Sequence, residues 1–237
     1  MLRASVALFG LILLSVNPAS AQTGTVPQYP RFEVSAGLGV MSRGPGEASE
    51  RALTSMDFHE SYGGPSMTRP HLDGLFKMEI GVTRHRSIGF LSTRGVDSTR
   101  GVRDVPGKPH ESLSVRHVVR TRAIVWSYRP NGWLSVGAGP AIHRRRFTID
   151  PPDHAAVGVR SDRSLGAVAG VNVKTRRRDG LFVHALLQYR YAGSLQSDSV
   201  PVPLGSRRVV PRENVTWPST KIPFSHRLMA MGIGFEL

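Results

Sequence analysis

The chain has 237 residues, of which 31 are lysine or arginine and 17 are acidic, and its formal net charge is +14. It contains no cysteine, which excludes a disulfide framework and a lipid-modified cysteine. It also lacks any run of 18 apolar residues, which excludes an ordinary membrane-spanning α-helix.

The N-terminal segment has the composition of a secretory signal. Arg3 supplies a positive start, residues 6–16 are apolar, and Ala19-Ser20-Ala21 ends the segment with the small residues that signal peptidase prefers. We therefore predict a cleaved signal peptide over residues 1–21 and a short polar lead over 22–30. Because export removes the chain from the cytoplasm, we expect its basic surface to meet anionic lipid and not nucleic acid.

Period-two alternation recurs along the rest of the chain. In residues 133–146, the even positions from Leu134 to Ile142 are apolar, and the odd positions are small or polar. This is the pattern of a β-strand with two different faces. Similar patterns predict eight strands, at residues 31–42, 75–83, 88–94, 112–128, 133–146, 163–176, 181–191 and 224–237.

The connections between these strands alternate in length. Short turns at 84–87, 129–132 and 177–180 include the turn pairs Asn131-Gly132 and Asp179-Gly180. An up-and-down barrel in a membrane requires this order, with short periplasmic turns and long extracellular loops. We therefore predict an all-β domain over residues 31–237, an eight-stranded antiparallel up-and-down transmembrane β-barrel. Its long loops would cover residues 43–73, 95–111, 148–162 and 192–222.

We assign the apolar face of each predicted strand to lipid and the polar face to the lumen. On the fourth strand this places Leu113, Val115, Val119, Ala123 and Val125 toward lipid. The interior of an eight-stranded barrel is just filled by side chains, and buried charges need partners. We therefore expect an ion-pair network that closes the lumen; the alternative is a proton or ion path. The expected network comprises Glu33, Lys77, Glu79, Arg116, Arg120, Arg122, Arg190 and Glu236, with His184 beside it.

Aromatic residues fall near the two ends of the predicted strands. Aromatic rings favour the two membrane–water interfaces, so we predict two girdles. The periplasmic girdle would contain Phe32, Trp126, Tyr128, Trp133 and Phe235, and the outer girdle Phe147, Tyr189 and Tyr191.

Residues 132–142, 166–174, 179–191 and 231–237 together resemble the small eight-stranded outer-membrane β-barrels of Gram-negative bacteria. The resemblance covers essentially the whole mature chain and lies in the strand pattern, not in one diagnostic motif. It implies an outer-membrane location, insertion by the barrel assembly machinery, and a monomer surrounded by lipid and lipopolysaccharide. Members of the family usually end on an aromatic residue, whereas this chain ends on Leu237.

Three consecutive arginines, Arg144, Arg145 and Arg146, fall at the predicted outer rim. Because the arginine fork suits phosphate geometry, we predict that they contact lipopolysaccharide phosphates.

Candidates for catalysis are sparse. Some barrels of this class modify lipid A with a histidine beside a serine or aspartate, which here would be Ser225 with His226, or His143 with Asp150. Adjacent strand residues point to opposite faces, so Ser225 and His226 are a poor nucleophile–base pair. We expect no catalytic residue, no metal site and no cofactor.

The sequence favours a non-enzymatic outer-membrane barrel that serves envelope structure or surface interaction through its extracellular loops, whose ligand is unknown. Two alternatives remain open. One is a lipid A-modifying barrel enzyme. The other is a soluble periplasmic lipocalin-like binder, which would have an apolar lumen and a polar exterior.

Overall fold

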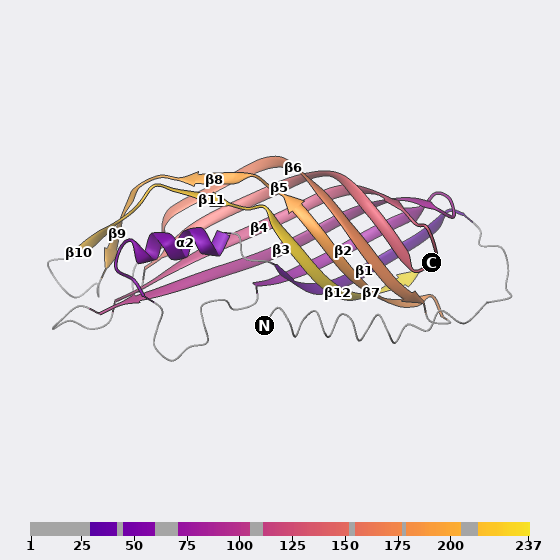
Figure 1. Ribbon diagram of the computed structural model, residues 1–237, viewed down its shortest axis with the longest axis horizontal. Helices are drawn as coiled ribbons and strands as arrows, with labels where there is room; N and C mark the ends of the chain where they lie inside the picture. Colours follow the sequence, from indigo (N-terminus) through magenta and orange to yellow (C-terminus); the bar gives the residue numbers. More distant parts are fainter. Residues whose placement is uncertain are drawn as a thin grey trace.

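The computed structural model describes residues 29–41, 45–59, 71–104, 111–151, 155–176, 179–204 and 213–237. The predicted signal peptide and most of the lead lie outside these residues. The described chain forms a closed barrel of eight strands in the order β1-β12-β7-β6-β5-β4-β3-β2 (Figure 1), with antiparallel neighbours throughout. The predicted fold class is therefore confirmed. The barrel strands are β1 (Arg31–Met41), β2 (His71–Gly81), β3 (Arg86–Arg103), β4 (Glu111–Tyr128), β5 (Leu134–Asp150), β6 (Val157–Arg176), β7 (Leu181–Tyr191) and β12 (His226–Glu236).

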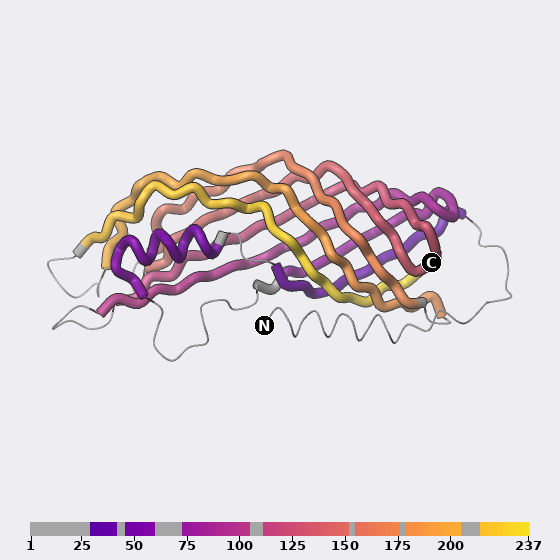
Figure 2. The backbone as a smooth tube through the Cα atoms, viewed as in Figure 1, coloured from indigo at the N-terminus to yellow at the C-terminus, as the bar shows by residue number. Residues whose placement is uncertain are grey.

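The barrel has four short strands and four long ones. β1, β2, β7 and β12 have 11 residues each, whereas β3 to β6 have 17 to 20. A tilted β-strand needs about 9–11 residues to cross a bilayer. The short strands are therefore just long enough, and the long strands project beyond them at the end away from the C-terminus (Figure 2).

The predicted loops at 95–111 and 148–162 are consequently too long. β3 continues to Arg103, and β6 already begins at Val157. The extension of β3 alternates between buried positions such as Asp97 and Thr99 and exposed positions such as Arg100. Because both of its faces contain polar residues, hydrophobic alternation did not reveal it.

The other two predicted loops contain regular structure as well. Helix α2 (Pro45–Thr54) lies between β1 and β2. A long ribbon between β7 and β12 pairs β8 (Ser194–Ser197) with β11 (Thr220–Pro223), and β9 (Val200–Leu204) with β10 (Glu213–Trp217). In Figure 1, the helix and the ribbon lie beside the projecting ends of the long strands. Within the described part of the chain, no helix is long and apolar enough to cross a bilayer.

The helix, the ribbon and the long strands enclose a hydrophobic core of their own, which we call the outer core. The buried positions of α2 recur at Ala48, Ala52 and Leu53, so one helical face packs against the strands. The outer core consists of Ala48, Ala52, Leu53, Met56, Phe58, Leu113, Val115, Val119, Phe147, Ile149, Ala192, Leu195, Val202, Leu204, Trp217, Ile222 and Phe224.

Nearer the short turns, large apolar side chains point outward and form a belt around the barrel. Leu38, Trp126 and Ile233 are 66%, 55% and 63% exposed. Exposed apolar side chains on this scale need a non-aqueous surrounding, and an apolar band flanked by aromatic residues is typical of membrane barrels. The belt therefore marks the membrane-spanning part of the barrel.

The structure corrects the assignment of the two faces of β4. Leu113, Val115 and Val119 point inward and are buried in the outer core. The arginines of the same strand, Arg116 and Arg120, are exposed on the outside. Above the belt the assumption that the apolar face meets lipid fails because the apolar side chains there face the protein interior. It also fails at Ala123 and Val125, which alternate with the outward Ile124 and Trp126 and point into the apolar interior of the barrel.

Candidate functional site

The periplasmic end of the lumen contains a layer of paired charges, which we call the ion-pair layer. Glu33 accepts hydrogen bonds from Arg129 and Lys174, at 2.8 and 2.6 Å. Glu79 lies opposite Glu33 in the strand register and pairs with Lys77 at 2.5 Å and with Arg129 at 3.0 Å. Arg129 therefore bridges two carboxylates that would otherwise repel each other.

Arg129 belongs to the turn between β4 and β5. Burial opposes its charged form, but Glu79 and Glu33 more than offset this effect and raise the pKa of the guanidinium above its ordinary value. Neither Arg129 nor Lys174 was in the predicted network. Arg129 is a turn residue, so its inward direction could not be read from strand alternation.

An apolar plug lies between the ion-pair layer and the outer half of the lumen. It consists of Met41, Leu75, Leu91, Ala123, Val125, Ala141, Val168, Leu186, Leu228 and Ala230. A cavity of about 20 Å³ is lined by plug residues such as Leu91 and by polar residues such as Lys77 and Asn172. That volume holds about one water molecule.

A second charged pair lies between the plug and the outer core. The guanidinium of Arg190 is hydrogen-bonded to Asp73, and both side chains are fully buried. Arg190 also donates to Gln188 at 2.9 Å and lies 3.4 Å from the ring of His226. Nearby, the ring of His143 is hydrogen-bonded to Thr121, at 3.0 Å.

The residues of the predicted network therefore separate into two groups. Glu33, Lys77, Glu79 and Arg190 have buried ion-pair partners inside the barrel, and Glu236 pairs with Arg31 at 2.7 Å at its periplasmic rim. The structure contradicts the lumenal placement of Arg116, Arg120 and Arg122, which are exposed on the outside of β4.

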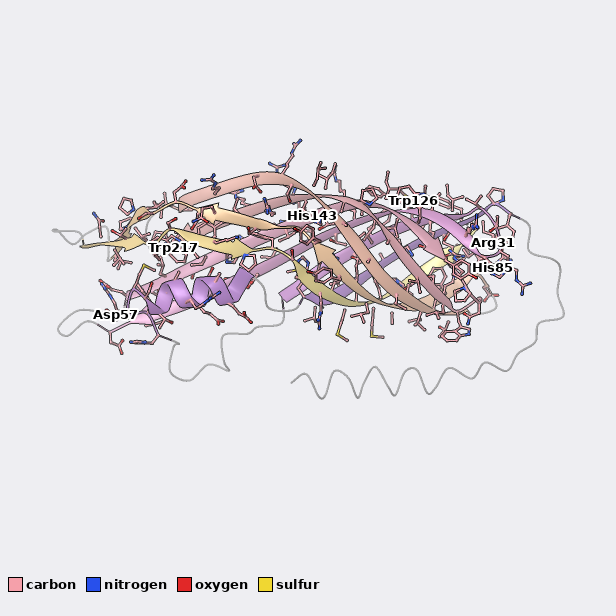
Figure 3. All side chains as sticks on the ribbon, turned by 45° about the horizontal axis from the view of Figure 1, so that its top comes forward. Arg31, Asp57, His85, Trp126, His143 and Trp217 are labelled. Carbon is pink, nitrogen blue, oxygen red and sulfur yellow. The ribbon has the colours of Figure 1, made fainter. Side chains whose placement is uncertain are left out.

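Of the eight residues predicted for the girdles, six are exposed, Phe32 is half-buried and Phe147 is buried. Figure 3 shows Trp126 toward the end that holds Arg31 and His85, and Trp217 toward the opposite end. Phe147, expected in the outer girdle, is 1% exposed because it belongs to the outer core. The side chains that are exposed at girdle positions are Trp126, Tyr128, Trp133, Tyr189, Tyr191 and Phe235.

The catalytic pairs considered from the sequence do not form. Ser225 accepts a hydrogen bond from the backbone of Ala192, and His226 is hydrogen-bonded to the carbonyl oxygen of Phe224. His143 is buried, and Asp150 lies seven residues away on the same strand, where alternation turns it to the other face. Among the described residues, no cluster of three or more histidine or acidic side chains could hold a metal ion.

A different serine–histidine pair occurs in the outer core. Ser49 Oγ of α2 lies 2.7 Å from Nε2 of His117 on β4, and Asp97 of β3 is opposite His117 in the register. The three residues are at most 1% exposed. The ring of His117 also packs on Phe147 and Phe224, with centroids 5.4 and 5.9 Å apart. The pair is buried in the outer core, and its hydrogen bond joins α2 to β4.

The outer wall of the long strands is rich in arginine. Arg144 and Arg146 are exposed there, as the predicted phosphate contact requires. Arg145 points inward and is bonded to Asp162 through two hydrogen bonds of 2.8 and 2.5 Å. It also donates to the carbonyl oxygen of Ala192 at 2.8 Å. Consecutive strand residues point to opposite sides of the sheet, so three consecutive arginines cannot all face one ligand. The predicted phosphate contact of Arg145 is therefore wrong.

Comparison with known proteins supports the fold. No family model and no curated protein sequence matches the chain. The structure of Ail, the attachment invasion locus protein of Yersinia pestis, in complex with the heparin analogue sucrose octasulfate, matches with a TM-score of 0.50 and 9% identity, covering 89% of this chain and all of Ail. The outer membrane protein OprG of Pseudomonas aeruginosa matches with a TM-score of 0.49 and 8% identity, over 88% of this chain and 96% of OprG. The outer membrane protease OmpT of Escherichia coli matches with a TM-score of 0.42 and 10% identity, over 91% of this chain and all of OmpT.

At 9% identity, the similarity to Ail concerns the fold and not the activity. With its closed eight-stranded barrel and its apolar belt, the chain has the fold of the small outer-membrane β-barrels of Gram-negative bacteria.

Proposed function

We propose that the protein is a non-enzymatic barrel of the outer membrane whose lumen is closed and whose outer part serves surface interaction. The observation that carries this proposal is the outer core. Side chains from α2, the ribbon, β4 and β5 are buried together above the apolar belt. A packed core of this kind gives the extracellular part a defined shape, which a set of flexible loops would lack.

The interior of the barrel is closed at several levels, which favours a role other than transport. The ion-pair layer, the apolar plug and the buried pair of Arg190 with Asp73 follow one another along the lumen. Water and ions would have to displace paired charges and packed apolar side chains at each level, which is costly.

Lipid, lipopolysaccharide and the barrel assembly machinery are the partners that an outer-membrane barrel implies, and we propose that the protein is a monomer. The ligand of the outer part is not identified by its geometry. The Ail structure is a complex with a heparin analogue, so a polyanion is one candidate to test here.

The proposal is tested by isolating the protein from envelopes and measuring its gel mobility before and after boiling. We expect it in the outer-membrane fraction with a heat-dependent shift, and we expect no steady conductance when it is added to a planar bilayer. A soluble periplasmic protein would contradict the membrane assignment, and a stable open channel would contradict the closed lumen. Labelling of Ser49 by a fluorophosphonate probe would favour a hydrolase over a non-enzymatic barrel.

A further inference from the structure

Four arginines stand side by side on the outside of the barrel, one on each long strand. The register places Arg94 opposite Arg120, Arg120 opposite Arg144, and Arg144 opposite Arg163. All four side chains are exposed. We call this line of residues the arginine row.

The four positive charges repel one another, and their described neighbours on the same face of the sheet do not relieve this repulsion. Side chains directly opposite each other in a sheet have Cβ atoms about 4.5–5.5 Å apart, and like charges in such pairs are destabilising. The outward-facing positions on either side of the row contain no acidic residue and include two further arginines. These positions are Ser92, Arg122, Ile142 and Leu165 on the side of the belt, and Val96, Val118, Arg146 and Ser161 on the other.

The position of the row indicates the ligand. On β5 and β6, the outward neighbours of Arg144 and Arg163 on the membrane side are Ile142 and Leu165, which are 54% and 84% exposed. On these two strands the row thus begins where the apolar belt ends, toward the outer end of the barrel. In a bilayer this level is that of the head groups, where the phosphates of the outer leaflet lie.

The width of the row favours a ligand with more than one phosphate. Neighbouring strands are about 4.8 Å apart, so four strands spread the guanidinium groups over about 14 Å. A single phosphate can engage about two neighbouring arginines through paired hydrogen bonds. The bisphosphorylated sugar head group of lipid A matches the row better than a phospholipid with one phosphate.

The other half of the barrel differs. Near the same level, the exposed side chains of β1 and β7 include Val40, Tyr189 and Tyr191, and a single arginine, Arg227, lies opposite Tyr189 on β12. In the described residues, the line of adjacent arginines is therefore confined to the side formed by β3 to β6.

We propose that the arginine row binds the phosphate groups of lipopolysaccharide, with Arg120 and Arg144 at the centre of the site. Each of these two residues has an arginine on both neighbouring strands, so each gains most from a bridging anion. Lipopolysaccharide then covers one side of the barrel. This inference rests on the proposed outer-membrane location.

The test compares the wild type with R120Q/R144Q and with the control R84Q/R86Q. The control removes the same charge from two exposed arginines at the periplasmic end of β3 and its turn. Each protein is refolded in a zwitterionic detergent and titrated with bisphosphorylated lipid A, dephosphorylated lipid A or phosphatidylglycerol. The readout is the temperature at which the heat-modifiable form is lost, from which an apparent affinity is obtained.

We expect bisphosphorylated lipid A to stabilise the wild type and the control equally, and to bind R120Q/R144Q about tenfold more weakly. Without lipid, R120Q/R144Q should be as stable as the wild type or more stable, because repulsion is removed. Equal responses of all three proteins would overturn the proposal. So would equal stabilisation of the wild type by dephosphorylated lipid A or by phosphatidylglycerol. A wild type with no heat-modifiable form would instead contradict the proposed barrel itself.

Discussion

The membrane-spanning half of the barrel and its outer half have opposite polarity on the same sheet. In the membrane half, residues such as Glu33 and Glu79 are inside, and Leu38 and Trp126 are outside. In the outer half of β4, Val115 is inside and the arginines are outside. Along β4 the alternation of side chains continues without interruption, but the surroundings of the sheet change from lipid to water. One β-strand can therefore pass through two environments if its apolar side chains lie on the outer face in lipid and on the inner face above it.

The two halves also differ in how they close their interiors. The membrane half uses paired charges and a small apolar plug, whereas the outer half uses a continuous hydrophobic core. Arg190 and Asp73 lie between the two. The predictions that follow test whether the halves are separate units, beginning with the largest expected effect.

Replacing Arg190 with leucine should destabilise the whole molecule most strongly. The change leaves Asp73 buried without its cation, and breaking a buried pair in this way typically costs about 3–5 kcal/mol. The expected result is a large fall in the denaturant concentration at which the heat-modifiable form is lost. The double variant D73L/R190L should recover most of this loss, since it leaves no buried charge. If the double variant is as unstable as R190L, packing and not charge pairing dominates at this level.

Replacing Trp217 with alanine should affect the outer half alone. Its side chain is fully buried and its ring lies 5.5 Å from that of Phe147, so the cavity should cost the outer core about 3–5 kcal/mol. We expect rapid proteolysis of the ribbon between β7 and β12 while the heat-dependent mobility shift remains. W133A, at an exposed belt position, serves as the control and should not change the proteolysis. Loss of the mobility shift in W217A would show that the two halves unfold together.

Most of the membrane half could be predicted from the sequence, and the reason is physical. Inside the belt, each outward residue meets lipid, so apolar residues at every second position reveal the outward face of β1, β5, β6 and β7. The same rule misplaced Ala123 and Val125, which point into the lumen. Above the belt the rule reverses, and there it misplaced Arg116 and Arg120. Inward residues supplied by turns, such as Arg129, have no alternation to reveal them.

The outer site was predicted less well because it depends on tertiary packing. Helix α2 is short, with glycine and proline at its start, and its few apolar residues acquire a partner only when β4 and the ribbon come together. The arginine row depends on register. Arg94, Arg120, Arg144 and Arg163 lie far apart in the sequence, and only the pairing of β3 to β6 makes them neighbours.

Replacing Arg129 with glutamine should have an intermediate effect and tests the membrane half. Glu33 retains Lys174 and Glu79 retains Lys77, so the expected loss is about 1–3 kcal/mol, the usual cost of removing one charged hydrogen-bonding partner. The lumen should remain non-conducting in a planar bilayer because the apolar plug is untouched. An open channel in R129Q would show that the ion-pair layer, and not the plug, closes the barrel.

Replacing Ser49 with alanine should have the smallest effect and asks what fixes α2 to the strands. The change removes the hydrogen bond to the buried His117, which should cost the outer core about 1–2 kcal/mol. S55A is the matched control, because the hydroxyl of Ser55 donates to the carbonyl oxygen of Ala52 near the end of the same helix. Faster proteolysis around α2 in S49A than in S55A would support an anchoring role. Equal proteolysis, together with a lipid A acylation pattern that changes when the wild type but not S49A is overexpressed, would instead make Ser49 a nucleophile and the outer core a structure that opens.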